Sequence, residues 1–116
     1  MTDCAKQISE RKKNMKKVDE MIIGKYCIVR CYRASVFAGI VEEREGQTVL
    51  IRDARRIWYW DGAASLSQLA LEGTKKPREC KFSAACESVV VLDAVEVIPC
   101  TDAARRSICE VQEWKV

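Results

Sequence analysis

Histidine is absent from all 116 residues of this chain, and its absence removes several kinds of chemistry at once. Without an imidazole, the chain has no conventional nucleophile–base triad and no histidine general base. It also contains no Gly-x-Gly-x-x-Gly or phosphate-loop pattern, and its isolated carboxylates show no acid–base or metal-binding spacing. We therefore expect a binding protein rather than an enzyme.

The cysteine pattern does not favour a metal site. The seven cysteines are an odd number, and no two of them form a Cys-x-x-Cys pair. Four cysteines could still coordinate zinc, but Cys27 and Cys31 would share one face of a strand, which suits core packing better. We expect most thiols to be reduced and buried, and we expect neither a metal nor a cofactor.

Long apolar runs are also missing. The run Met21-Ile22-Ile23 is too short for a membrane span or for the apolar core of a signal peptide. Apolar residues make up 48% of the chain and charged residues 32%, which is typical of a folded globular domain. We therefore expect a cytoplasmic protein with no membrane partner and a single domain over residues 1–116.

Most of the net charge of +3 lies near the N-terminus. Residues 1–24 contain six Lys or Arg and four Asp or Glu, so the rest of the chain is close to neutral. A protein that binds duplex nucleic acid usually carries a basic excess on its folded body. The charge distribution weakens that function without excluding it, and the N-terminal lysines are best explained as a solvated helix face, with membrane-surface or nucleic-acid contact as the alternatives.

The hydrophobic periodicity changes from helical to alternating after Gly24. We expect an N-terminal helix within residues 1–23, over about 3–21, followed by a β-rich body over 24–116. The predicted elements of that body are strands over 26–32, 37–43, 48–52, 57–60, 88–92 and 95–98, short helices over 66–71 and 102–108, and an edge strand within 111–116. The expected class is α+β with a mostly antiparallel sheet of five or six strands.

Aromatic and basic side chains gather at the start of residues 55–73. Arg55 and Arg56 precede the run Trp58-Tyr59-Trp60, and guanidinium groups beside aromatic rings suit a ligand with both a ring and a phosphate. Because the two arginines alternate across a strand, at most one faces a given pocket. The structural alternatives are surface ion pairs for the arginines and core packing for the rings.

Two further places carry candidate ligand-binding residues. Phe82 follows a polar, basic loop over 72–81, where an exposed ring could stack on a base, although a strand residue turned inward is the alternative. Arg105 and Arg106 lie in the short helix after Thr101, where a solvated helix face is the alternative.

Four ordered blocks resemble the first family of phage anti-Thoeris proteins. They are residues 30–39 (RCYRASVFAG), 54–63 (ARRIWYWDGA), 66–70 (LSQLA) and 95–101 (VEVIPCT), and the likeness extends over about residues 22–116. The resemblance implies a non-enzymatic protein that binds and sequesters cyclic ADP-ribose signals, which bacterial TIR-domain defence enzymes make. It would act in the cytoplasm of the infected bacterial cell.

The resemblance also implies an assembly and a site. Ligand pockets would lie between the subunits of a homodimer, dimers would join into hexamers, and separate sites would hold cyclic di- or trinucleotides of CBASS-type defence. For cyclic ADP-ribose, Phe82 is the candidate for base stacking and Asp93 for a polar contact to base or ribose. The candidates for phosphate binding are Arg56 and Arg105, with Arg55 and Arg106 beside them.

Two other functions remain open from the sequence. The same rings and the N-terminal lysines would also serve a small β-rich module that binds RNA or single-stranded DNA. A structural assembly protein without a ligand is the third possibility, and it would be favoured if the purified protein carries no nucleotide absorbance and Phe82 is buried.

Overall fold

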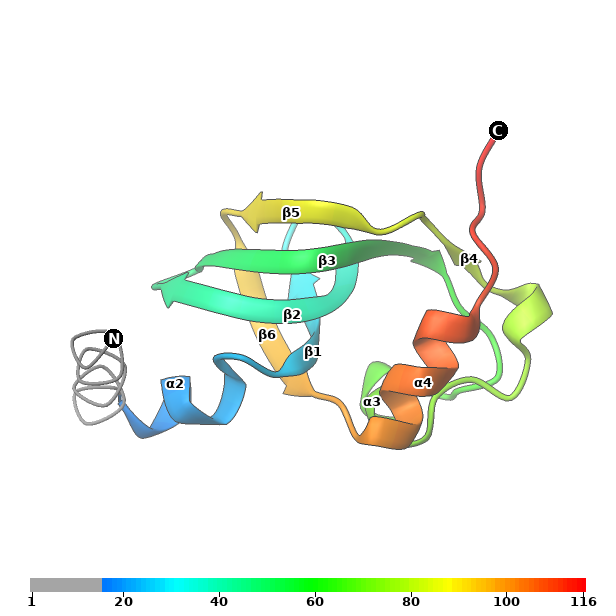
Figure 1. Cartoon of the computed structure of the whole chain (residues 1–116), viewed down its shortest axis with the longest axis horizontal. Helices are drawn as coiled ribbons and strands as arrows, with labels where there is room; N and C mark the ends of the chain where they lie inside the picture. Colours follow the sequence, from blue (N-terminus) through cyan, green and yellow to red (C-terminus); the bar gives the residue numbers. More distant parts are fainter. Residues whose placement is uncertain (1–15) are drawn as a thin grey trace, which may run out of the picture.

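The computed structural model describes residues 16–116 and confirms the α+β class, with six antiparallel strands and three α-helices (Figure 1). The elements in chain order are α2 (Lys17–Ile22), β1 (Tyr26–Cys31), β2 (Val36–Glu45), β3 (Thr48–Tyr59), α3 (Leu66–Glu72), the 3-10 helix η1 (Pro77–Glu79), β4 (Lys81–Phe82), β5 (Cys86–Val91), β6 (Ala94–Pro99) and α4 (Asp102–Glu110).

The long strand β3 pairs with three other strands, β2 along one edge and β4 and β5 along the other. The strand order is β4-β3-β2-β1-β6, and β5 pairs with the first part of β3. The sequence predicted two separate strands here, over 48–52 and 57–60, and that prediction is wrong. Asp53 takes a positive φ of 52°, but β3 keeps its pairing with β2 on both sides of this residue. The irregularity is therefore absorbed within one strand, at a residue type that tolerates this conformation.

Two apolar cores lie on opposite faces of the sheet, because alternate residues of each strand point to opposite sides. The first core includes Cys27, Val29, Phe37 and Ile51, and Ile22 of α2 packs at its edge. The second core lies beneath α3 and α4, and its members include Tyr26, Ile28, Ile57, Leu69, Phe82 and Ile108. Figure 1 shows α3 and α4 together at one end of the molecule and α2 at the other.

The two short helices after β3 begin where the sequence predicts. Ser65 accepts a hydrogen bond from the Gln68 amide, and Thr101 accepts one from the Ala104 amide, so both helices have a side-chain N-cap. Gly73 ends α3 with a φ of 77°. A Cβ at this glycine would lie 2.3 Å from the Cβ of Ser107, so its small size also permits the close approach of α3 to α4.

The N-terminal helix differs from the expectation. Lys16 has an extended backbone (φ −65°, ψ 150°), and α2 begins only at Lys17 without a side-chain cap. A continuous helix through Lys16 is therefore wrong, and the remainder of the predicted helix, residues 3–15, lies outside the described residues. Within residues 16–116, no helix has both the length and the apolar character that crossing a membrane requires.

The raised pKa values of two thiols make the free energy of unfolding depend on pH. Burial raises the pKa of Cys27 from 9.0 to about 11 and that of Cys100 to about 12. The unfolded chain ionises these thiols at the ordinary pKa, whereas the folded chain keeps their protons. Their contribution is complete below pH 9, and it is lost progressively as the pH rises through 9 to 11.

We expect the free energy of unfolding to fall over this window by up to about 1.4 kcal/mol per pH unit for each thiol. Urea unfolding at pH 8, 9, 10 and 10.5 measures this slope. The variant Cys27→Ala/Cys100→Ala is the matched control and should show a shallower slope above pH 9. Equal slopes for the two proteins would contradict the assignment to these thiols.

Candidate ligand-binding site

Arg55 is a structural residue that joins three segments. Its side chain is buried, with 6% of the residue exposed. Nε donates to the Ser83 carbonyl and Nη1 to the Ile108 carbonyl, both at 2.7 Å, and Nη2 donates to the Phe82 carbonyl at 3.4 Å. Ile108 lies in the last turn of α4, where the helix dipole favours a cation. Arg55 therefore ties β3 to β4 and α4.

Phe82 is fully buried (0% exposed), so the exposed stacking ring expected at this position is wrong. β4 pairs with β3 at Ile57↔Phe82, which turns the ring into the core under α4. The Arg55 guanidinium lies over the ring, 5.5 Å from its centroid. The opposite edge of β4 is covered as well, because the Trp114 amide donates to the Phe82 carbonyl at 2.8 Å.

Arg56 points to the other face of the sheet, as strand alternation predicts, and belongs to an exposed aromatic and cationic cluster. We call Arg56, Trp58, Lys81 and Trp114 the Trp–Arg surface. Trp58 is 53% exposed and Trp114 44%, and their rings meet edge to face with centroids 6.4 Å apart. The Arg56 guanidinium lies 5.2 Å from the Trp58 centroid, and Lys81 Nζ lies 5.5 Å from the Trp114 centroid.

Three segments that are distant in sequence position this surface. Arg56 is opposite Phe37 of β2, and its guanidinium rests 4.8 Å from that ring's centroid. Lys81 precedes the buried Phe82 in β4, so its side chain points away from the core. The C-terminal tail forms a single parallel bridge, Phe82↔Glu113, rather than the edge strand expected over 111–116, and this bridge places Trp114 beside β4.

The charges of this surface are available to an anion. Among the described residues, neither Arg56 nor Lys81 forms an ion pair, and the nearby carboxylate of Glu113 pairs with Lys115. Two cations beside two half-exposed indole rings can contact the phosphate and the base of a nucleotide together.

Asp93 is the only acidic residue among the predicted site residues, and it lies far from Arg56 in sequence. Burial and the Asp93 carboxylate raise the pKa of the Cys31 thiol to about 11, whereas Arg56 lowers it, so both charges act on the same thiol. Asp93 occupies the turn between β5 and β6, and it accepts a hydrogen bond from the Arg33 amide at 2.7 Å. Within residues 16–116, Asp93 forms no ion pair with Arg56.

The remaining predicted residues lie elsewhere. Arg105 and Arg55 line a small cavity of about 270 Å³ beside Tyr26, and the Arg105 guanidinium lies 5.0 Å from the Tyr26 ring centroid. The cavity also contains Asp53 and Glu113, so its lining has no net charge, and it is smaller than most ligand pockets. Arg106 is exposed on α4. One chain therefore does not gather all six predicted residues into one pocket.

Metal binding finds no support in the described part of the chain. Within residues 16–116, no group of three or more Cys, Asp or Glu side chains comes together in an arrangement that could hold an ion.

Sequence reasoning missed the contribution of Lys81 and Trp114 to the site. The sequence places Lys81 only in the polar, basic loop over 72–81 and Trp114 only in the edge strand expected within 111–116. Lys81 and Trp114 come together beside β4 only because Phe82 pairs with Ile57. The pairing involves only a two-residue strand, which is too short to give a periodic signal.

We expect Arg55→Lys to lower the free energy of unfolding by about 2–4 kcal/mol, because a lysine cannot reach three carbonyls and leaves buried acceptors unpaired. Arg56→Lys is the matched control, with an expected change below about 1 kcal/mol, since the partly exposed cation is retained. Urea unfolding monitored by circular dichroism measures both. Equal losses for the two variants would contradict the structural role of Arg55.

Comparison with known proteins identifies a family whose function is unknown. No curated protein and no solved structure matches the chain. The sequence profile of DUF6948, a domain of unknown function, matches residues 24–108. The matched range includes Arg56, Trp58, Lys81 and Asp93, and it ends before Trp114. Because the match covers most of the chain, this protein belongs to the DUF6948 family.

Proposed function

We propose that this protein is a phage anti-defence protein that binds and sequesters cyclic ADP-ribose signals without cleaving them. The observation that carries the proposal is the Trp–Arg surface, where half-exposed rings lie beside cations that form no ion pair with any carboxylate within residues 16–116. The resemblance of four sequence blocks to anti-Thoeris proteins supplies the ligand class.

The ligand's chemistry matches that of the surface. Cyclic ADP-ribose contains an adenine, which can stack on an indole face, and a pyrophosphate, which can accept hydrogen bonds from Arg56 and Lys81. Stacking contributes about 1–3 kcal/mol per base, and charge-assisted hydrogen bonds contribute about 1.5–3 kcal/mol each. The Asp93 carboxylate can accept hydrogen bonds from ribose hydroxyls or from the adenine amino group.

A second copy of the chain would complete the site. Tight sequestration requires most of the ligand surface to be buried, and the Trp–Arg surface is open on one chain. The exposed apolar side chains Tyr32 and Leu92 lie beside Asp93, and the Tyr32 amide donates to the Asp93 carbonyl at 2.9 Å. Exposed aromatic and aliphatic groups suit a subunit interface. They are compatible with a homodimer, and the joining of dimers into hexamers is implied by the resemblance alone.

Binding of cyclic ADP-ribose isomers to the full chain tests the proposal. We expect tight binding by calorimetry and recovery of intact ligand, by mass spectrometry, after heat denaturation of the complex. Trp58→Ala and Arg56→Ala should each weaken binding by about tenfold or more, because each removes about 1.4 kcal/mol or more. Arg52→Ala is the matched control, since Arg52 lies on the same strand, pairs with Glu42 and should not affect binding.

Three results would contradict the proposal. Hydrolysed ligand would indicate an enzyme, and undepleted free ligand would exclude sequestration. Preferential binding of RNA or single-stranded DNA, with an affinity that falls steeply with salt, would favour the nucleic-acid module instead. Cyclic di- and trinucleotides belong in the same assay, where binding that does not compete with cyclic ADP-ribose would place them at separate sites.

A further inference from the structure

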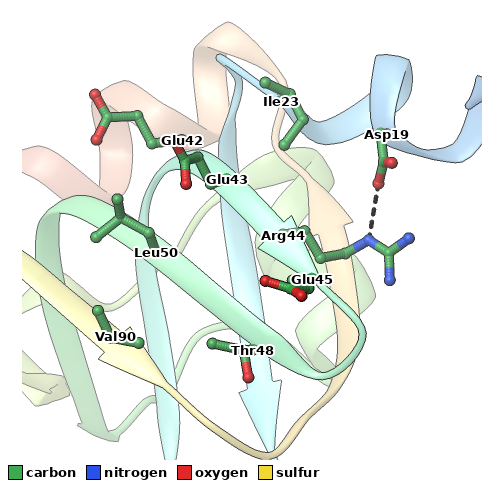
Figure 2. A pocket seen from close by; sticks show the side chains of 9 residues that line it. All are labelled: Asp19, Ile23, Glu42, Glu43, Arg44, Glu45, Thr48, Leu50 and Val90. Carbon is green, nitrogen blue, oxygen red and sulfur yellow. Dashed lines mark hydrogen bonds and ion pairs between the residues drawn. The ribbon is translucent and has the colours of Figure 1, made fainter. Parts of the chain in front are cut away.

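An acidic groove lies beside α2, on the part of the sheet that α3 and α4 do not cover (Figure 2). Its volume is about 590 Å³. We define the acidic groove by its lining residues, which come from α2 and the turn after it and from β2, β3 and β5: Asp19, Ile23, Glu42, Glu43, Arg44, Glu45, Thr48, Leu50 and Val90.

The acidic groove combines an apolar floor with a carboxylate rim. Leu50 and Val90 are cross-strand partners, and Val90 is exposed although it is apolar. Glu43 is opposite Leu50 in the register of β2 and β3, and Glu45 is opposite Thr48, so both carboxylates stand on the same face as the floor. The register thus builds an amphipathic surface from three neighbouring strands.

The charge of the acidic groove is strongly one-sided. Its lining holds four carboxylates and one guanidinium. Asp19 pairs with Arg44 at 2.8 Å and Glu42 pairs with Arg52, whereas Glu43 and Glu45 form no ion pair with any residue from 16 to 116. Such a surface repels phosphates and attracts a cationic segment with apolar side chains.

We propose that the occupant of the acidic groove is the chain's own N-terminal segment, residues 1–15. The segment has the complementary chemistry: four cations against two carboxylates, together with the apolar side chains of Ile8 and Met15. Its cations are Lys6, Arg11, Lys12 and Lys13. Ion pairs between these cations and the carboxylates of Glu43 and Glu45 would neutralise the charges of both partners. The apolar side chains of the segment would then cover Leu50 and Val90.

The connection of the segment to α2 favours this contact within one chain. Asp19 of α2 and Ile23 just after it line the acidic groove, so the segment is attached at the groove's edge. Fifteen residues span about 22 Å as a helix and about 50 Å when extended, and either length is enough to reach Glu43. Attachment also gives an effective concentration on the order of millimolar, which populates even a weak contact.

Carbodiimide coupling of the full chain tests the proposal directly, because this reagent joins a lysine amine to a carboxylate only where the two are in contact. We expect digestion and mass spectrometry to find links from Lys12 or Lys13 to Glu43 or Glu45 in protein of monomer mass. The ion pair between Lys115 and Glu113, at 3.6 Å, is the internal positive control for coupling. Glu43→Gln/Glu45→Gln should abolish the groove links and leave the control link unchanged.

A charge exchange makes the test independent of any loss of folding. Glu43→Lys/Glu45→Lys should lose the groove links, and adding Lys12→Glu/Lys13→Glu to that variant should restore links between the same positions with the charges reversed. The proposal is overturned if the control link forms without groove links, or if groove links occur only in protein of dimer mass, which would make a second copy the occupant. Ligand binding at the Trp–Arg surface should not change in any of these variants, so the two proposals fail separately.

Discussion

The hydrogen bonds of the Arg55 guanidinium are the interaction on which the rest of the structure depends. They join β3 to the carbonyls of Phe82, Ser83 and Ile108, so one buried cation fixes the position of β4 and of the end of α4. Because β4 is only two residues long, few other contacts can hold it in register. Lys81 and, through the bridge to Glu113, the neighbouring Trp114 depend on this register.

Strand alternation then gives the two adjacent arginines different roles. Arg55 faces the core under α4, where backbone carbonyls accept its hydrogen bonds. Arg56 faces outward between Phe37 and Trp58. The structural arginine thus positions the one that is available to a ligand. The acidic groove beside α2 has the opposite charge and is lined by other residues, so the fold keeps its basic and acidic surfaces apart.

Local signals in the sequence predicted much of this fold, and non-local pairing accounts for what they missed. The starts of the short helices over 66–71 and 102–108 were predicted correctly because the chemistry of their caps, Ser65 and Thr101, involves only neighbouring residues. The continuity of β3 through Asp53, the burial of Phe82 and the approach of Trp114 to Lys81 depend on partner strands and on the tail.

The central claim is that the Trp–Arg surface binds a nucleotide ligand, and the indole N–H signals of the three tryptophans test it most directly. A ¹⁵N–¹H spectrum of the full chain, titrated with cyclic ADP-ribose, reports on each ring separately. We expect large shifts for Trp58 and Trp114 and a small shift for Trp60, which packs against the core under α3 and α4. Unchanged signals for Trp58 and Trp114 at saturating ligand, or a shift confined to Trp60, would contradict the claim.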